Sequence, residues 1–181
     1  MTGRIIIPLN GLPAGKSTFS FKADKEFFEY FDNSEILDAQ LDIQVVAVKS
    51  PGYLGIDCTI DGELVVACDR CLEDLEIPVH SLVKLSVKSG PMEADSPQGL
   101  QDDGRETLYI QDEEPDLDLS QTVYDYSCLS VPLHHVHEDG KCNPETVKYL
   151  NPYSELQDIR EEAGEMPFAG LKALLGNKDS N

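Results

Sequence analysis

The chain has no tryptophan, few basic residues and no apolar run approaching the length of a membrane span. Crossing a bilayer takes about 20 consecutive apolar residues in a helix. Residues 1–10 contain one arginine and a short isoleucine run closed by Pro8, which does not resemble a signal peptide. These absences lead us to expect a cytoplasmic protein with no membrane partner.

The 14 basic residues stand against 34 acidic ones, which gives a formal net charge of −20. Residues 91–120 alone contain ten acidic residues and one basic residue. Lysine and arginine contacts to phosphates supply most of the non-specific affinity for nucleic acids, so direct binding to bare RNA is disfavoured. The charge predicts a basic protein as the direct partner, unless the acidity serves solubility alone.

At 181 residues, the chain is expected to form one domain over residues 1–175, followed by a disordered tail at 176–181. Alternating apolar and polar residues at 36–48 and 75–87 predict half-buried strands. An Asp61-Gly62 pair predicts a hairpin turn, and a change of phase near Ser81 predicts a bulge. Residues 89–106, rich in glycine, proline, aspartate and serine, predict a mobile acidic loop.

The full set of expected elements describes an α+β fold. Its sheet is an antiparallel meander from residues 4–88 and 107–110, with closure into a barrel left open, and short helices from the C-terminal half pack on it. Further strands are expected at 4–9, 18–21, 53–60, 64–67 and 108–110. Helices are expected after Asp24 and at 119–129, 143–150, 153–162 and 168–175.

The five cysteines favour metal ligation or buried thiols over disulfides, because their number is odd and no secretion signal is evident. Cys68 and Cys71 are two residues apart at the end of a predicted strand, a spacing that lets two thiolates bind one Zn²⁺. His137 and Cys142 are the best source of two more ligands. Together they would make a structural Cys₃His site.

Several alternatives remain open at this point. His134 and His135 compete for the place of the imidazole, and the cysteines are equally compatible with buried apolar thiols. Thioredoxin-like chemistry ranks last, since renewed strand alternation follows the cysteine pair. Arg70, between the two cysteines, is a candidate for binding a carboxylate or phosphate, or for an ordinary surface ion pair.

No catalytic constellation is predicted. The segment Gly11-x-x-x-Gly15-Lys16-Ser17 resembles a phosphate-binding loop but is one residue too short, and strand-like residues follow it. We interpret it as a turn.

Residues 68–72, Cys-Asp-Arg-Cys-Leu, resemble the C-x-R-C-L signature of the YceD family. Residues 129–133, Leu-Ser-Val-Pro-Leu, followed by His137 and Cys142, resemble the second motif of that family. Residues 167–175 are similar to its closing helix, and the resemblance covers residues 36–175. The pair His134-His135 and a longer acidic insertion depart from the family pattern.

The resemblance implies a bacterial, non-enzymatic factor for the accumulation of large-subunit ribosomal RNA. Family genes commonly neighbour the gene of a basic, zinc-type ribosomal protein, which suggests a basic ribosomal protein or a pre-ribosomal particle as partner. The alternative hypothesis is a zinc hydrolase or thiol oxidoreductase that uses the Cys/His cluster. A third is an interaction protein unrelated to ribosomes.

Overall fold

The computed structural model describes residues 4–90, 104–111 and 114–150. The chain forms two compact units, residues 1–136 and 137–181. The expected tail, most of the expected loop and the two helices expected after residue 150 lie outside the described residues. Within the described part, no helix has both the length and the apolar character needed to cross a membrane.

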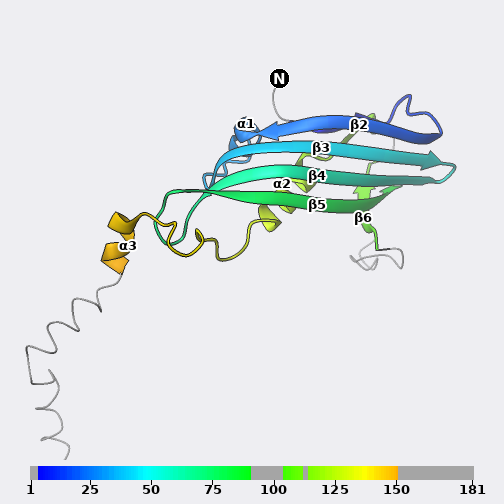
Figure 1. The fold of residues 1–181 in the computed structure, drawn as a ribbon. Coiled ribbons are helices and arrows are strands. Elements are labelled where there is room, and N and C mark those ends of the chain that lie inside the picture. Colours follow the sequence, from blue (N-terminus) through cyan, green and yellow to red (C-terminus); the bar gives the residue numbers. More distant parts are fainter. Residues whose placement is uncertain (1–3, 91–103, 112–113, 151–181) are drawn as a thin grey trace, which may run out of the picture. The chain divides into compact units, whose positions relative to one another are not determined.

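The first unit is built on a five-stranded sheet of order β2-β3-β4-β5-β6 (Figure 1). Strands β2 (Gly15–Asp24), β3 (Ile36–Ser50), β4 (Tyr53–Ala67) and β5 (Asp74–Ser89) form an antiparallel meander. Strand β6 (Glu106–Ile110) runs parallel to β5. The predicted α+β fold is confirmed, and so is the antiparallel meander for β2–β5. Residues 107–110 were expected to pair antiparallel but pair parallel with β5, and the strand expected at 4–9 belongs to a second sheet. The large sheet is open, with β2 and β6 at its edges.

Smaller elements complete the described residues. Strands β1 (Ile6–Pro8) and β7 (Asp116–Asp118) form a second, two-stranded sheet. Helix α1 (Lys25–Glu29) follows β2, and helix α2 (Ser120–Leu129) follows β7. Helix α3 (Pro144–Leu150) belongs to the second unit.

One face of the large sheet carries the hydrophobic core. Leu41, Ile43 and Val45 alternate inward along β3, while the polar residues between them are exposed, as the period of two requires. The core also contains Phe27 of α1, whose backbone N–H donates to the Asp24 carboxylate at 3.3 Å and so caps the helix. Val123 of α2 lies in the same core.

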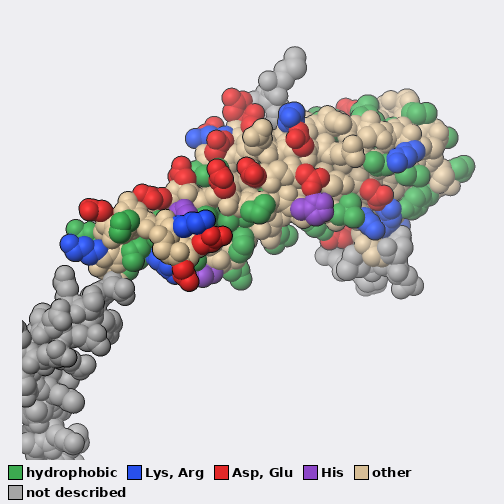
Figure 2. All heavy atoms as spheres, viewed as in Figure 1, with side chains coloured by type: hydrophobic (Ala, Val, Ile, Leu, Met, Phe, Trp, Pro, Cys, Tyr) green, Lys and Arg blue, Asp and Glu red, His purple; other side chains and the backbone are tan. Residues whose placement is uncertain are grey.

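The opposite face of the sheet is polar. Acidic side chains on β3, β4 and β5 are exposed there, and Figure 2 shows acidic groups gathered over the described surface. Exposed members of this face are Asp38, Asp42, Asp61, Glu63 and Glu76.

Two local predictions about the meander are wrong. Asp61 and Gly62 form no hairpin turn, because β4 runs through them without a break. Gly62 has φ +148°, and a Cβ there would lie 2.1 Å from the Gln40 carbonyl oxygen. The glycine therefore serves a close approach of two strands rather than a reversal of the chain.

The bulge predicted near Ser81 is also absent. Ser81 pairs with Ile60 in an unbroken β4–β5 register. The apparent change of phase arises because Leu82 is 55% exposed on the polar face. The register shifts instead at the start of β3, between Ile36 and Asp38.

Candidate metal centre

The Cys68–Cys71 pair lies in a tight turn between β4 and β5. The Cys68 N–H donates to the Glu73 carbonyl at 2.8 Å, and the Leu72 N–H donates to the Cys68 carbonyl at 2.9 Å. Leu72 has φ +61°, a left-handed conformation that is uncommon outside glycine. The turn also places the Arg70 N–H 3.4 Å from the Cys68 sulfur, so a backbone amide donates to the sulfur. We call residues 68–72 the knuckle.

The knuckle cysteines are buried without belonging to the hydrophobic core. Cys68 is 0% and Cys71 3% exposed, yet neither is a member of the core cluster. Cys58, by contrast, is a core residue, and burial raises the pKa of its thiol to about 12. Cys58 thus fits the description of a buried apolar thiol, which the knuckle cysteines do not.

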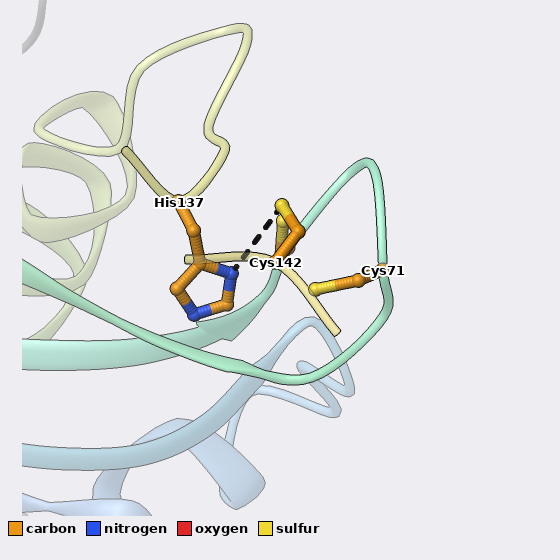
Figure 3. A group of neighbouring side chains, drawn as sticks. Cys71, His137 and Cys142 are labelled. Atoms are coloured by element: carbon orange, nitrogen blue, oxygen red, sulfur yellow. Dashed lines mark hydrogen bonds between the residues drawn. The ribbon is translucent and has the colours of Figure 1, made fainter. Parts of the chain in front are cut away.

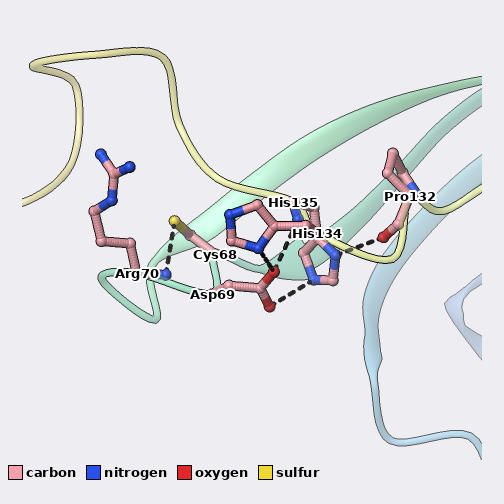
Figure 4. A network of polar contacts seen from close by, with 6 residues as sticks. All are labelled: Cys68, Asp69, Arg70, Pro132, His134 and His135. Carbon is pink, nitrogen blue, oxygen red and sulfur yellow. Dashed lines mark hydrogen bonds and ion pairs between the residues drawn. The ribbon is translucent and has the colours of Figure 1, made fainter.

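The segment after α2 is tied to the knuckle through Asp69 (Figure 4). The Asp69 N–H donates to the His135 carbonyl at 3.0 Å, and the His135 N–H donates to the Asp69 carboxylate at 2.8 Å. The same carboxylate lies 3.1 Å from His134 Nδ1 and 3.4 Å from His135 Nε2. The hydrogen bond from the His135 backbone, aided by the two imidazoles, holds the pKa of Asp69 below its usual value.

These contacts occupy two of the three candidate histidines. His135 Nδ1 lies 2.9 Å from the Pro132 carbonyl, which only accepts, so this nitrogen carries a proton in the contact. Both rings thus face Asp69 or the backbone. The backbone of His135 is hydrogen-bonded to Asp69 of the knuckle. His137, two residues later, is the next imidazole along the chain and the candidate ligand that remains.

In the second unit, His137 and Cys142 lie at the two ends of a short loop. Figure 3 shows the His137 ring facing the Cys142 sulfur, with 4.0 Å between Nδ1 and Sγ. The Lys141 N–H donates to the Glu138 carbonyl at 2.9 Å, and Gly140, at φ +80°, closes the turn. Asn143 then caps α3, as predicted, by accepting from the Glu145 N–H at 2.9 Å.

Cys68 and Cys71 of the first unit, with His137 and Cys142 of the second, make up one set of predicted zinc ligands. They supply three thiols and one imidazole, donors that zinc prefers over carboxylates.

Arg70, the candidate binding residue, makes no ion pair with the described residues. Figure 4 shows its side chain extending away from Asp69 and the two histidines. Its backbone N–H donates to the Cys68 sulfur, whereas its guanidinium group points away from the Asp69 contacts. The phosphate-loop look-alike is a turn only at its start, at Gly11, and its last three residues belong to β2, which begins at Gly15. Strand β2 continues from it, where a phosphate-binding loop would require a helix.

Sequence reasoning missed the role of Asp69. Its position between the cysteines gave no sign of a partner, because His135 lies 66 residues away along the chain. The nearby His134-His135 pair was the one available signal, and it suggested competing metal ligands instead of partners for a carboxylate.

Comparison with known proteins agrees with these motifs. The family model described as large ribosomal RNA subunit accumulation protein YceD matches residues 56–175, about two thirds of the chain. The chain belongs to the YceD family. No curated protein and no solved structure matches it. The YceD match includes the knuckle and the His137–Cys142 loop, so all four grouped residues lie within the family region.

Proposed function

We propose that this YceD-family chain is a non-enzymatic, cytoplasmic bacterial factor that supports accumulation of large-subunit ribosomal RNA by binding a basic ribosomal protein or a pre-ribosomal particle. The family match carries this proposal, because the family is described by that role. The net charge of −20 supports a basic protein surface, rather than bare RNA, as the direct contact.

The proposal includes one structural Zn²⁺ held by Cys68, Cys71, His137 and Cys142. Support comes from the donor set of three thiols and one imidazole, and from the amide of Arg70 that donates to the Cys68 sulfur. Four protein ligands make a closed site, whereas a catalytic zinc ordinarily keeps one position for water. The ligand set therefore favours a structural role over the alternative of a zinc hydrolase.

The alternative of a thiol oxidoreductase has less support. Redox-active thiols are partly exposed and lie in electropositive surroundings. Cys68 and Cys71 are buried, and the two charged residues between them, Asp69 and Arg70, are of opposite sign, so the sequence there is not electropositive. These surroundings do not favour an attacking thiolate.

Capture from a bacterial lysate tests the function. The tagged full chain, incubated at low salt, is expected to retain large-subunit ribosomal proteins or precursor particles, and raised salt should weaken the retention. Arg70→Ala should reduce capture if the guanidinium binds a carboxylate or phosphate of the captured particle, while Lys22→Ala, which removes an exposed lysine paired with Asp42, is the matched control. Absence of every ribosomal component at low salt would contradict the proposal.

Metal analysis tests the zinc site separately. Protein purified without added zinc is expected to contain one zinc per chain, and X-ray absorption should show three sulfurs and one nitrogen. A spectrum with three protein ligands and a water would favour the hydrolase instead. Retention of ribosomal components by a zinc-free chain would leave the binding function in place and remove the metal.

A further inference from the structure

A cavity of about 340 Å³ lies in the first unit beside the knuckle. Its walls come from the start of β3, the end of β4 and the segment that ends α2. The volume is at the lower end of the roughly 300–1,000 Å³ typical of small-ligand pockets. It has room for one long side chain rather than for a folded segment.

The cavity has an apolar lining and an acidic rim. Ile36, Val66 and Val131 contribute aliphatic surface, whereas Glu35 and Asp69 contribute carboxylates. No lysine or arginine is among the lining residues. This combination suits a side chain with an apolar stem and a cationic end.

The thiol of Cys128, in the cavity wall, lies near enough to Glu35 to feel its charge. Burial is the main reason why the pKa of Cys128 is raised; hydrogen bonds with Tyr124 and Asn33 lower it, and the negative charges of Asp125 and Glu35 raise it. The Glu35 carboxylate therefore acts on the lining of the cavity and not only on solvent. A phosphate or carboxylate ligand would meet repulsion there, whereas a cation would be attracted.

The wall that carries Glu35 is held in place before any ligand arrives. The Asn33 side chain accepts from the backbone N–H groups of Glu35, at 2.8 Å, and Ile36, at 3.1 Å. Its amide group donates to the Tyr124 hydroxyl at 3.0 Å, which connects the start of β3 to α2. A preformed wall reduces the entropy lost on binding.

We infer that this cavity is an anchor site for one lysine or arginine side chain of the basic partner, an inference that rests on the proposed function for the identity of that partner. The aliphatic stem packs against Val66 and Val131. The cationic end lies against the Glu35 carboxylate, and Asp69, which already accepts from the His135 N–H, adds negative charge in the same cavity wall. A single cationic anchor in a preformed apolar pocket is a common way for a binding surface to select its partner.

The test uses capped tripeptides and the full chain as purified. Acetyl-Gly-Arg-Gly-amide and its lysine counterpart should shift the methyl NMR signals of Ile36, Val66 and Val131 in a saturable way. The citrulline counterpart has almost the same shape without the charge and should bind at least about tenfold more weakly. Glu35→Gln should weaken arginine binding about three- to tenfold, while Glu63→Gln, on the polar face of β4, should leave it unchanged.

Equal binding of the arginine and citrulline peptides would overturn the anchor site. So would unshifted methyl signals at about 10 mM peptide, or equal effects of Glu35→Gln and Glu63→Gln. Capture of ribosomal components by a chain that binds no peptide would refute the anchor and keep the function. Peptide binding by a chain that captures none would refute the function and leave a cation-binding cavity.

Discussion

His134, His135 and His137 lie within four positions but have different partners. The carboxylate of Asp69 accounts for the difference. Asp69 engages His134 and His135 directly, through ring and backbone contacts. His137 instead faces Cys142. A metal site built on the cysteines would therefore use the third imidazole, although the other two are close in sequence.

The two exchanges His137→Asn and His134→Asn test this assignment. His137→Asn removes a proposed ligand and is expected to lower the zinc content from one per chain to a small fraction of that value. His134→Asn should leave the zinc content unchanged, because the His134 side chain is 76% exposed and its ring contacts the Asp69 carboxylate rather than a cysteine. Elemental analysis of both purified variants gives the result. Full zinc content in the His137 variant would show that the imidazole comes from elsewhere.

Asp118 joins the N-terminal segment to the start of α2 and predicts a pH dependence. Burial raises its pKa, but hydrogen bonds from Ser120 and the ion pair with Arg4 outweigh burial and hold the pKa below its usual value. A carboxyl of this kind stabilises the fold above its unfolded pKa of about 4, and the stabilisation is lost as the pH falls through the folded pKa.

Asp118→Asn is therefore expected to lower the free energy of unfolding at pH 7. The decrease should stay below about 1 kcal/mol, because the side chain is 37% exposed and solvent screens the interaction. At about pH 3, below the unfolded pKa, the difference between the variant and the natural chain should be smaller, because the stabilisation is lost as the pH falls towards the lowered pKa of the native carboxyl. Urea unfolding at both pH values measures the difference, and an equal difference at both would contradict the explanation.

At the scale of elements, the long β3–β4 pair depends on a glycine in the middle of a strand. Gly62→Ala would bring a methyl group to 2.1 Å from a backbone carbonyl that cannot move without disturbing the sheet. The expected cost exceeds about 3 kcal/mol, since strain from φ +148° adds to the overlap. Gly52→Ala is the control, because it has φ +75° but open space around it, and should cost about 1 kcal/mol. Equal costs in urea unfolding would mean that only backbone conformation matters.

How far the elements could be predicted depended on whether the information was local. The alternation along residues 36–48 located β3, because the polarity of each residue indicates which face of the sheet its side chain occupies. The pair Asp61-Gly62 has the same sequence in a hairpin turn and in a close strand approach, and only Gln40 on the neighbouring strand distinguishes the two. The three-residue β7 is held by pairing with β1, over a hundred positions earlier, and carries no periodic pattern of its own.

The same reasoning applies to the candidate metal centre. The spacing of Cys68 and Cys71 is a local signal, so it was visible in the sequence. The link between Asp69 and His135 is a tertiary contact and was not. Leu82 is a local signal that misled the prediction. It is an apolar residue on the exposed face of β5, and in the sequence it has the same pattern as a change in strand register.

For the whole molecule, the negative charge is concentrated enough to oppose folding. Asp42 and Asp61 are direct cross-strand neighbours on the polar face, an arrangement that is destabilising for like charges. Lys22 pairs with Asp42 at 2.8 Å and so compensates part of the repulsion, while His80 contacts Asp61 on the other side. A basic partner would relieve more of it.

Salt should therefore act in opposite directions on folding and on binding. Raising NaCl from about 50 mM to about 500 mM is expected to stabilise the free chain, because screening reduces repulsion within a chain of net charge −20. The same change should weaken capture of the basic partner. The urea midpoint and the retained fraction measure the two effects. A free chain that loses stability in salt would show that favourable ion pairs outweigh the repulsion.

Removing the proposed zinc should affect one end of the first unit and leave its core folded. The core cluster includes residues from β3, β4, β5, α1 and α2 but neither knuckle cysteine, so its apolar burial does not depend on zinc. In a zinc finger, metal binding supplies most of the folding free energy, whereas here apolar burial in the sheet supplies it.

Chelation is thus expected to abolish amide exchange protection at residues 68–73, while amides of β3 and β4 remain protected. Hydrogen exchange with and without chelator measures this, with Cys128→Ser as a control that keeps the metal, since Cys128 lines the neighbouring cavity and is not one of the grouped ligands. Loss of protection throughout the sheet would mean that the metal holds the whole fold together, and unchanged protection at the knuckle would mean that no metal stabilises it.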